Sequence, residues 1–142
     1  ILSDYNFDGF AIGGSLGKNT DDLEFVLKNT IPYLPPDKPK HLLGIADIPS
    51  ITIALRYGID TFDSSYPTKC ARHGVLFSDK GLIKIKQSKW NDVHEPISKA
   101  PLCENYTLSY LHHLFKANEQ TAGTLASLNN IWYIGSIAKT AS

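Results

Sequence analysis

The chain has 142 residues, of which 42% are hydrophobic and 20% charged, and its formal net charge is zero. This composition is typical of a globular domain and excludes disorder of the whole chain. No run approaches the roughly 18 apolar residues of a membrane-spanning helix, and the start does not resemble a signal peptide, so we expect no membrane partner. Two cysteines cannot form a disulfide framework, which favours a reducing compartment such as the cytoplasm. Because the chain lacks Met and begins with Ile1, we expect it to be part of a longer protein.

The first half of the chain alternates short apolar runs with helical patterns. Apolar runs at residues 7–12, 41–46 and 59–65 predict three strands. Between the first two runs, Asn19, Thr20 and Asp21 offer N-cap oxygens for a helix that the prolines from Pro32 onward end. Asp47, Pro49 and Gly58 bound a second helix over SITIALRY. This alternation of strands and helices predicts parallel βα units, and therefore an α/β fold.

The second half follows a different pattern. Residues 74–86 (GVLFSDKGLIKIK) alternate apolar and polar side chains about Asp79-Lys80-Gly81, which predicts a β-hairpin. Two helices are expected over residues 104–118 and 121–134. The apolar faces of these helices contain Leu108, Leu111, Leu114 and Phe115 in the first, and Leu125, Leu128 and Trp132 in the second.

The charges are distributed unevenly. Residues 67–90 contain six basic side chains and one acidic side chain, a local charge of +5, whereas the segments on either side are net negative. By itself such a segment indicates either a solvated hairpin face or a contact with a polyanion.

The ends of the expected strands carry the candidate chemistry. Parallel βα proteins bind ligands at the carboxyl ends of their strands. These ends contain Gly13 and Gly14, then Leu43 and Gly44, then Asp63. Glycines let a planar ligand approach the backbone, and a carboxylate can serve as base, nucleophile or metal ligand. Taken singly, a glycine pair is also typical of a turn and an aspartate of a helix cap.

Two acids of the third strand compete for a catalytic role. Asp60 and Asp63 lie three residues apart, so they point to opposite faces of a strand. The apolar side chains that share each face do not distinguish the two acids. Asp63 is nearer the carboxyl end and precedes the loop that starts at Ser64, which favours it, whereas Asp60 is interpreted as a local cap or partner of the neighbouring helix end.

One stretch is more specific. Residues 58–74, GIDTFDSSYPTKCARHG, resemble the nucleophile region of the tRNA-guanine transglycosylases, GIDMFDCVxPTRxARxG. The segments GFAIGGSLG, LPPDKPKHLLGI and YLHHLFKANE resemble further family segments in the same order. The resemblance covers essentially the whole chain and corresponds to the C-terminal part of a typical member.

The resemblance implies a fold and a reaction. The chain would be the C-terminal part of a (β/α)8 TIM barrel, with residues from about 67 to 130 covering the β-hairpin and a helical remnant of a zinc-binding subdomain. The family exchanges the guanine at the wobble position of tRNA anticodons for a 7-deazaguanine, either preQ1 or queuine. The intact protein can then be a homodimer, as relatives are. The isolated chain is expected to be inactive.

The resemblance also implies the roles of individual residues. Asp63 falls on the nucleophile that attacks the ribose C1′, Gly13 and Gly14 on the backbone that binds the base, and Leu43 on a Met that packs on the base. Two runs fall on loops that contact tRNA: Gly44, Ile45, Ala46, Asp47, Ile48, Pro49 and Ser50, and then Thr68, Lys69, Cys70, Ala71 and Arg72. With this family match, tRNA contact becomes the favoured interpretation of the +5 segment.

The sequence departs from the family in three places. The zinc positions hold Ser98, Ala100, Cys103 and Asn129, so three of four ligands are missing and we expect no zinc and no other cofactor. Asn129 should instead point inward and find hydrogen-bond partners. A family Arg is replaced by Lys69, and the loop GGSLG is one residue shorter than its counterpart. The alternative to an enzyme is a catalytically inactive tRNA- or partner-binding subunit, or a structural part of one.

Overall fold

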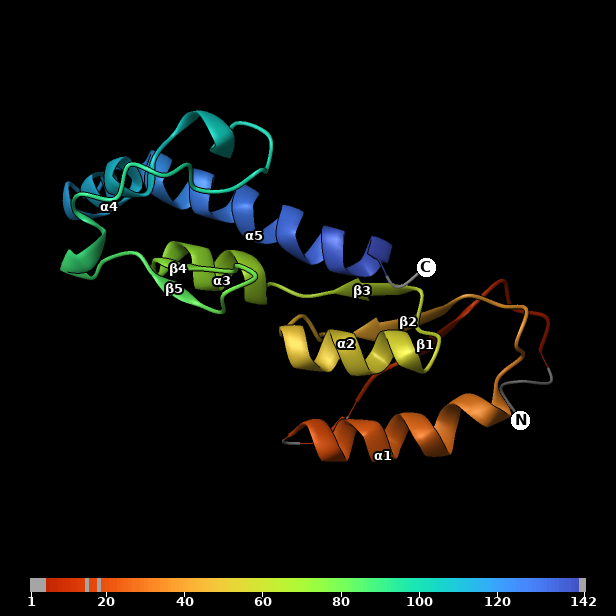
Figure 1. Cartoon of the computed structure of the whole chain (residues 1–142). Coiled ribbons are helices and arrows are strands. Elements are labelled where there is room, and N and C mark those ends of the chain that lie inside the picture. The colour runs from red at the N-terminus through yellow and green to blue at the C-terminus, as the bar shows by residue number, and fades with distance from the viewer. Residues whose placement is uncertain (1–4, 15, 18, 141–142) are drawn as a thin grey trace. The chain divides into compact units, whose positions relative to one another are not determined.

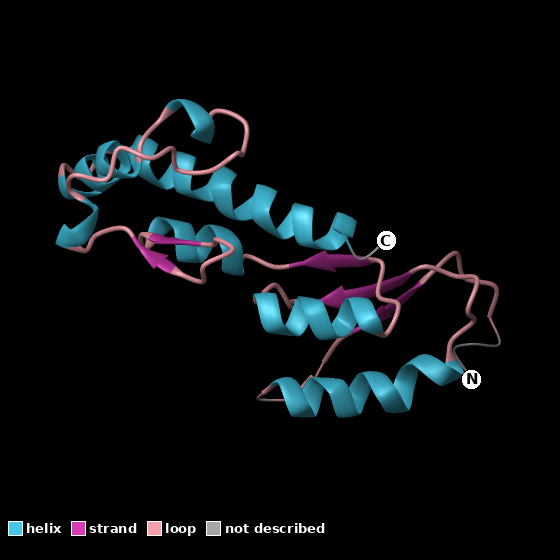
Figure 2. Cartoon of the chain, viewed as in Figure 1, coloured by secondary structure: helices cyan, strands magenta, loops and turns pink. Residues whose placement is uncertain are grey.

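The computed structural model describes residues 5–14, 16–17 and 19–140 (Figures 1 and 2). The described chain forms two compact units: the first runs to Ser65 and also includes the end of the chain from Ala138, and the second is Tyr66–Ile137. The helices and small sheets make the chain a mixed α/β protein, as the sequence predicts.

The first unit is built on a three-stranded parallel sheet. The strands β1 (Phe10–Ile12), β2 (Lys40–Leu43) and β3 (Thr61–Asp63) lie in the order β1-β2-β3, which is also their order along the chain. Ala11 pairs with His41 and His41 with Thr61, while Leu43 pairs with Asp63. All three expected strands are confirmed, although each is shorter than its apolar run.

Two helices connect the strands of this sheet. In α1 (Thr20–Thr30), the Asn19 side chain caps the first turn by accepting the Asp22 N–H at 2.9 Å, and a 3₁₀ turn, η2 (Ile31–Tyr33), follows. In α2 (Ile48–Arg56), Asp47 is the N-cap and accepts the Ser50 N–H at 3.0 Å. Gly58 follows α2 with a φ of +74°, a left-handed conformation that ends the helix. The helix boundaries therefore confirm the capping signals in the sequence.

The apolar core of the first unit lies on one face of the sheet. Ile12 and Leu42 point to this face and pack with Leu23 and Leu27 of α1 and Ala54 of α2. Both helices lie on the same side of the sheet in Figure 1. Side chains of the other parity, such as His41 and Leu43, lie on the opposite face, away from α1 and α2.

The second unit begins with a short helix and the expected hairpin. α3 (Tyr66–Arg72) is followed by β4 (Val75–Leu76) and β5 (Ile83–Lys84), which pair antiparallel, and Gly81 turns between them with a φ of +98°. The hairpin is confirmed, but its ladder is two residues long. It stops before Phe77 because the side chain of Asn130 accepts the Phe77 N–H at 2.9 Å and that of Asn129 donates to the Phe77 carbonyl at 3.1 Å.

Two longer helices complete the second unit after the 3₁₀ turns η3 (Ser88–Trp90) and η4 (Cys103–Asn105). α4 (Leu108–Lys116) buries Leu108, Leu111 and Leu114 as expected, and starts at its Thr107 cap rather than at residue 104. The expected face of α5 (Gln120–Thr140) is wrong in part, because Leu128 is 37% and Trp132 38% exposed. The buried face of α5 instead contains Ala122, Leu125, Ala126, Asn129 and Asn130.

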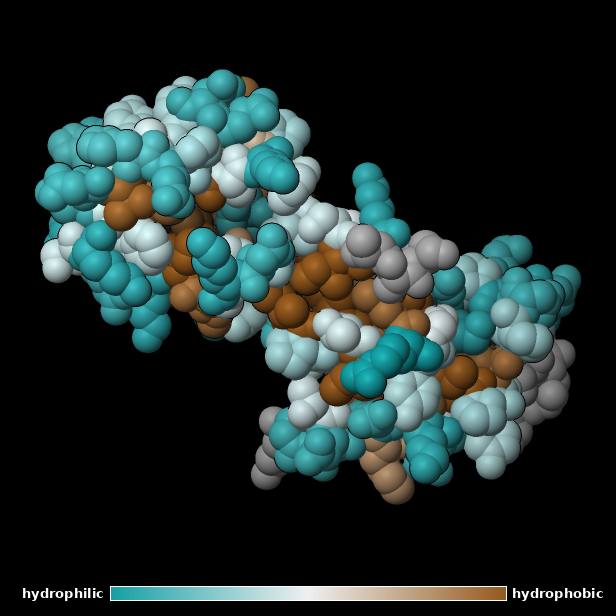
Figure 3. Space-filling model, viewed as in Figure 1, coloured by the Kyte–Doolittle hydropathy of each residue, from teal (hydrophilic) through white to brown (hydrophobic). Residues whose placement is uncertain are grey.

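The surface is mostly hydrophilic in the view of Figure 3, with hydrophobic patches on each unit. Large apolar side chains among the exposed residues include Phe25, Leu43 and Ile131. Within the described ranges, no helix has both the length and the apolar character needed to cross a membrane.

Candidate functional site

Residues from three different strands meet at the carboxyl ends of the parallel sheet. Gly13 directly follows β1, Leu43 ends β2 and Asp63 ends β3. The register pairs Leu43 with Asp63 on the face of the sheet away from α1 and α2. Gly13 lies against the Leu43 side chain, since a Cβ at position 13 would come within 2.5 Å of Leu43 Cδ1. Gly14 has a φ of +87° and opens a loop in which Ser15 lies outside the described residues.

The two competing acids differ in what they contact. The Asp60 carboxylate accepts the Lys40 N–H at 2.8 Å, and the Asp60 N–H donates to the Lys40 carbonyl at 2.9 Å. Asp60 is thus a local partner, as expected, although its partner is the start of β2 rather than a helix end. The Asp63 side chain is 60% exposed and faces away from the core. Both acids are exposed, but the Asp60 carboxylate binds the backbone at the start of β2, whereas Asp63 lies at the carboxyl end of β3, where parallel βα proteins bind ligands.

Sequence reasoning missed two residues beside Asp63. His41 Nε2 lies 3.1 Å from Asp63 Oδ1, and His41 Nδ1 lies 2.7 Å from Thr61 Oγ1. The Gly44 N–H also points to Asp63 Oδ1, at 3.3 Å. The alternation of side chains along β2 and β3 was the available signal, because it places His41, Thr61 and Asp63 on one face once the register is known.

The segment that follows β2 divides into exposed and buried positions. Gly44 and Pro49 are exposed, and Ile45, Asp47 and Ile48 are half-buried. Ala46 and Ser50 are only 6% and 7% exposed. The residues of this segment that a ligand could reach are therefore those at the strand end and at the first turn of α2.

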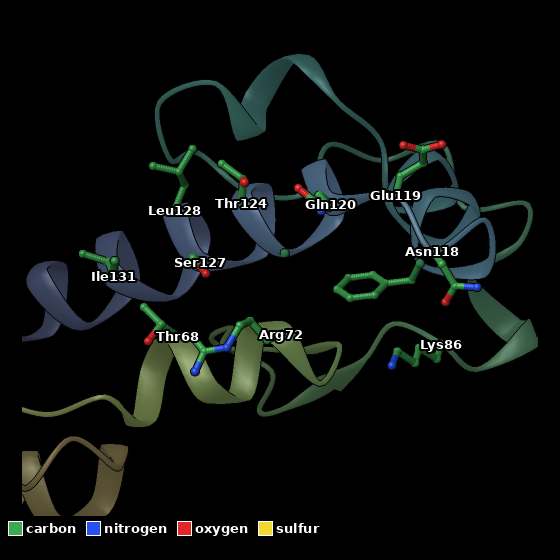
Figure 4. Close-up of a pocket in the computed structure, with 12 residues that line it drawn as sticks. Thr68, Arg72, Lys86, Asn118, Glu119, Gln120, Thr124, Ser127, Leu128 and Ile131 are labelled. Atoms are coloured by element: carbon green, nitrogen blue, oxygen red, sulfur yellow. The ribbon is translucent and has the colours of Figure 1, made fainter.

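The run from residue 68 to residue 72 forms most of α3 in the second unit. Ala71 is fully buried in the core and Cys70 is half-buried, while Lys69 and Arg72 are exposed. Thr68 and Arg72 extend from α3 toward a groove of about 750 Å³ against α5 (Figure 4). The groove is also lined by Lys86, by the acid Glu119 and by polar side chains of α5, among them Thr124 and Ser127.

The basic residues of segment 67–90 are all exposed. They are Lys69, Arg72, Lys80, Lys84, Lys86 and Lys89. Within the described part of the chain, no carboxylate lies within ion-pair distance of any of them. Lys86 Nζ lies 5.4 Å from the centre of the Phe115 ring, and Lys89 Nζ lies 4.9 Å from that of Trp90. Exposed cations without carboxylate partners remain available to phosphates.

The four positions at which the family resemblance implies zinc ligands form a hydrogen-bonded cluster instead. The Cys103 thiol donates to the Leu125 carbonyl at 3.4 Å, and burial raises its pKa, opposed by hydrogen bonds from the Ser98 side chain and the Asn129 backbone. The Ser98 hydroxyl accepts the Ala100 N–H at 3.1 Å. Asn129 is 1% exposed and its amide donates to the Phe77 carbonyl, which confirms that it points inward.

This cluster does not fit a zinc ion. Zinc takes four nitrogen, sulfur or carboxylate donors, and its thiol ligands are deprotonated. Here one position is Ala100, the only thiol is a hydrogen-bond donor, and the Asn129 amide is engaged with backbone and Asn130. In the parts of the chain that the structure describes, no group of three or more His, Cys, Asp or Glu residues could hold a metal ion.

Fold and site together define a parallel βα protein with an exposed carboxylate at its strand ends and a separate basic unit. The family model described as queuine tRNA-ribosyltransferase matches residues 1–141, so the chain belongs to that family of transferases. Similar proteins named queuine tRNA-ribosyltransferase include one from Protochlamydia amoebophila, 48% identical over 94% of this chain and 35% of its own length. Those of Chlamydia felis and Chlamydia caviae are 45% and 47% identical, over 98% of this chain and 38% of theirs. The chain thus spans little more than a third of these relatives.

Proposed function

We propose that this chain is part of a tRNA-guanine transglycosylase, which exchanges the wobble guanine of a tRNA anticodon for a 7-deazaguanine, preQ1 or queuine. Asp63 is the nucleophile and forms a covalent intermediate with the ribose. The observation that carries this proposal is the convergence of Gly13, Leu43, Gly44 and Asp63 from three parallel strands. Family membership and the resemblance of segment 58–74 support the same reaction.

The chemistry of base exchange suits an exposed carboxylate. In the first step, one Asp63 oxygen bonds to C1′ while the bond from C1′ to the guanine nitrogen breaks. The electron pair of the broken bond leaves with guanine, which gains a proton. The incoming base loses a proton from its ring nitrogen, which then bonds to C1′, and the electron pair of the ester bond returns to Asp63. Both steps pass through a cation-like sugar centre that a carboxylate stabilises.

The neighbouring residues suit a flipped base. A nucleobase taken out of its stack needs an apolar surface to cover its ring and backbone groups to bind its polar edge. Leu43 is 44% exposed beside Asp63, and Gly13 and Gly14 offer backbone without side chains. We assign the base pocket to these three residues.

The sheet supports a barrel as the fold of the intact protein. Parallel sheets are covered on both faces in α/β proteins. Here the strands follow chain order, both helices lie on one face, and the other face carries Asp63. A (β/α)8 barrel has this arrangement, with further strands closing the open face into its interior.

The second unit is assigned to tRNA. The six exposed basic residues of segment 67–90 and the groove beside Thr68 and Arg72 suit phosphates that flank the target nucleotide. The residues around Cys103 are the remnant of a zinc subdomain that holds no zinc, so no cofactor is assigned. The intact enzyme would act in the cytoplasm, as a homodimer if it assembles like its relatives.

The test uses the intact protein that carries this segment. Asp63→Asn should abolish formation of the denaturant-resistant tRNA adduct. It should also abolish base exchange with labelled guanine. Asp60→Asn is the matched control, because its amide oxygen can still accept the Lys40 N–H, and it should leave the adduct forming. An adduct that survives Asp63→Asn contradicts the assignment. An intact protein that binds tRNA but forms no adduct supports the alternative, an inactive binding subunit.

A further inference from the structure

A line of three polar side chains crosses the exposed face of the sheet. His41 of β2 pairs in register with Thr61 of β3, and Leu43 pairs with Asp63, so these side chains share one face. The imidazole bridges the other two groups, with Nδ1 at 2.7 Å from Thr61 Oγ1 and Nε2 at 3.1 Å from Asp63 Oδ1. The functional assignment above gives no role to either His41 or Thr61.

The two contacts select one neutral tautomer. An ionised carboxylate only accepts hydrogen bonds, so His41 must carry a proton on Nε2 to bind Asp63. In the neutral ring Nδ1 is then an acceptor, and the Thr61 hydroxyl can donate to it. The other neutral tautomer would set two lone pairs against each other at Asp63. Thr61 therefore orients the ring so that its N–H faces the carboxylate.

The contacts also distinguish the two carboxylate oxygens of Asp63. Oδ1 receives His41 Nε2–H and the Gly44 N–H at 3.3 Å. In the described residues no donor binds Oδ2. With one oxygen held by donors from β2 and from Gly44, which follows it, the carboxylate loses rotational freedom while its second oxygen stays free to attack.

Other charged groups near His41 are engaged elsewhere. The Lys40 ammonium donates to the Lys38 carbonyl at 3.0 Å, and the Asp60 carboxylate accepts the Lys40 N–H. On β1 the register partner of His41 is Ala11, which does not titrate. Asp63 is thus the one titratable group that His41 contacts within the described residues.

We propose that His41 is a positioning residue for Asp63, with the neutral imidazole holding the nucleophile for attack and the protonated ring restraining it. This inference rests on the proposed function. When the ring gains a second proton, the neutral hydrogen bond becomes an ion pair that draws electron density from the carboxylate. Base exchange should then slow toward acid pH.

The experiment measures the single-turnover rate of adduct formation from pH 5 to pH 9 in the intact protein. The wild-type rate should fall toward acid pH. His41→Gln places a non-titrating N–H near the position of Nε2, so it should keep most of the rate at pH 8 and lose the acid decline. His41→Ala should lower the rate at pH 8 by about 10- to 100-fold, with an unchanged KM for tRNA. His113→Gln, an exposed histidine of α4, is the control and should match the wild type.

The outcomes separate this inference from the proposed function. An adduct in Asp63→Asn overturns both. If Asp63→Asn forms no adduct while His41→Ala keeps the wild-type rate and pH profile, the nucleophile stands and the positioning role is wrong. If His41→Ala does not fold, ¹⁵N NMR of the wild type at pH 8 decides, because the proposal requires the imidazole proton on Nε2 and a proton on Nδ1 contradicts it.

Discussion

The side chain of Leu43 occupies the space that a Cβ would need at Gly13. An ideal Cβ there would lie 2.5 Å from Leu43 Cδ1 and 3.1 Å from Leu43 Cβ. Glycine at the end of β1 therefore sets the position of an exposed apolar side chain at the end of β2. In the proposed enzyme that side chain covers the base, so Gly13 shapes the pocket as well as lining it.

Gly13→Ala should therefore weaken base binding more than it weakens the fold. The new methyl group collides with the flexible end of Leu43, which can turn away at small cost. We expect KM for the base to rise about 10-fold, which corresponds to about 1.4 kcal/mol. Gly135→Ala adds the same methyl group where nothing lies within 4 Å, and should leave KM unchanged. An unchanged KM in Gly13→Ala would contradict this role.

Asn130→Ala should destabilise the second unit strongly. The fully buried Asn130 side chain accepts the Phe77 N–H and donates to the carbonyls of Pro67 and Val75 at 3.0 and 2.9 Å. Alanine leaves these groups without a partner, at about 1–3 kcal/mol for each buried group left unsatisfied. Urea unfolding should show a loss of about 3 kcal/mol or more. Asn91→Ala, whose exposed side chain donates to Asp92, should cost less than about 0.5 kcal/mol.

The untagged, purified protein should contain no stoichiometric zinc. The only thiol of the cluster, on Cys103, is a donor to Leu125, and the Asn129 amide is committed to Phe77. Elemental analysis tests this directly. A second measurement is unfolding in the presence of a chelator, which should leave the midpoint unchanged. One zinc per chain that a chelator removes with loss of stability would refute the expectation.

The Cys103 thiol should make stability fall at alkaline pH. Burial raises the pKa of this thiol above its ordinary value of 9.0, so the unfolded chain loses the proton first. The stabilising contribution is therefore complete below about pH 9 and is lost as pH rises through the folded pKa. Cys103→Ala should flatten the alkaline side of a plot of stability against pH. Cys70→Ala, at a half-buried position, is the control and should keep the wild-type decline.

Arg72 and Lys86 should contribute to tRNA affinity through phosphate contacts. Both line the same groove in Figure 4. Changing either to Gln in the intact protein should weaken tRNA binding and reduce the slope of log K against log salt by about 1. Lys28→Gln, an exposed lysine in α1, should not change the slope. Equal slopes for all three variants would show that the groove does not bind phosphate.

Local signals predicted the first unit well, because each of its elements is bounded by residues with a strong conformational preference. Asn19 and Asp47 accept backbone N–H groups at helix starts, and Gly58 ends α2 in a left-handed conformation. Because a helix connects each pair of apolar runs, the alternation favours a parallel sheet. The candidate site followed in part, since Gly13, Leu43 and Asp63 lie at strand ends.

What the sequence did not reveal depends on partners far away in the chain. The buried face of α5 contains two asparagines, and a hydrophobic pattern cannot identify them as core residues. Their partners at Phe77 lie more than 50 residues earlier. Similarly, the contact of His41 with Asp63 needs the strand register, which no local motif encodes.

The hydrogen bond from Asn130 to the Pro67 carbonyl also bears on the order in which the second unit can assemble. α3 has seven residues, too few to be stable as an isolated helix. Pro67, in the first turn of α3, lies 63 residues before the asparagine that anchors it. On the ribosome, the segment after Asp63 therefore emerges well before α5. It cannot fold stably until α5 has been synthesised. If synthesis stops before α5 is made, the basic segment 67–90 remains unfolded. Such a nascent chain should be especially sensitive to proteolysis.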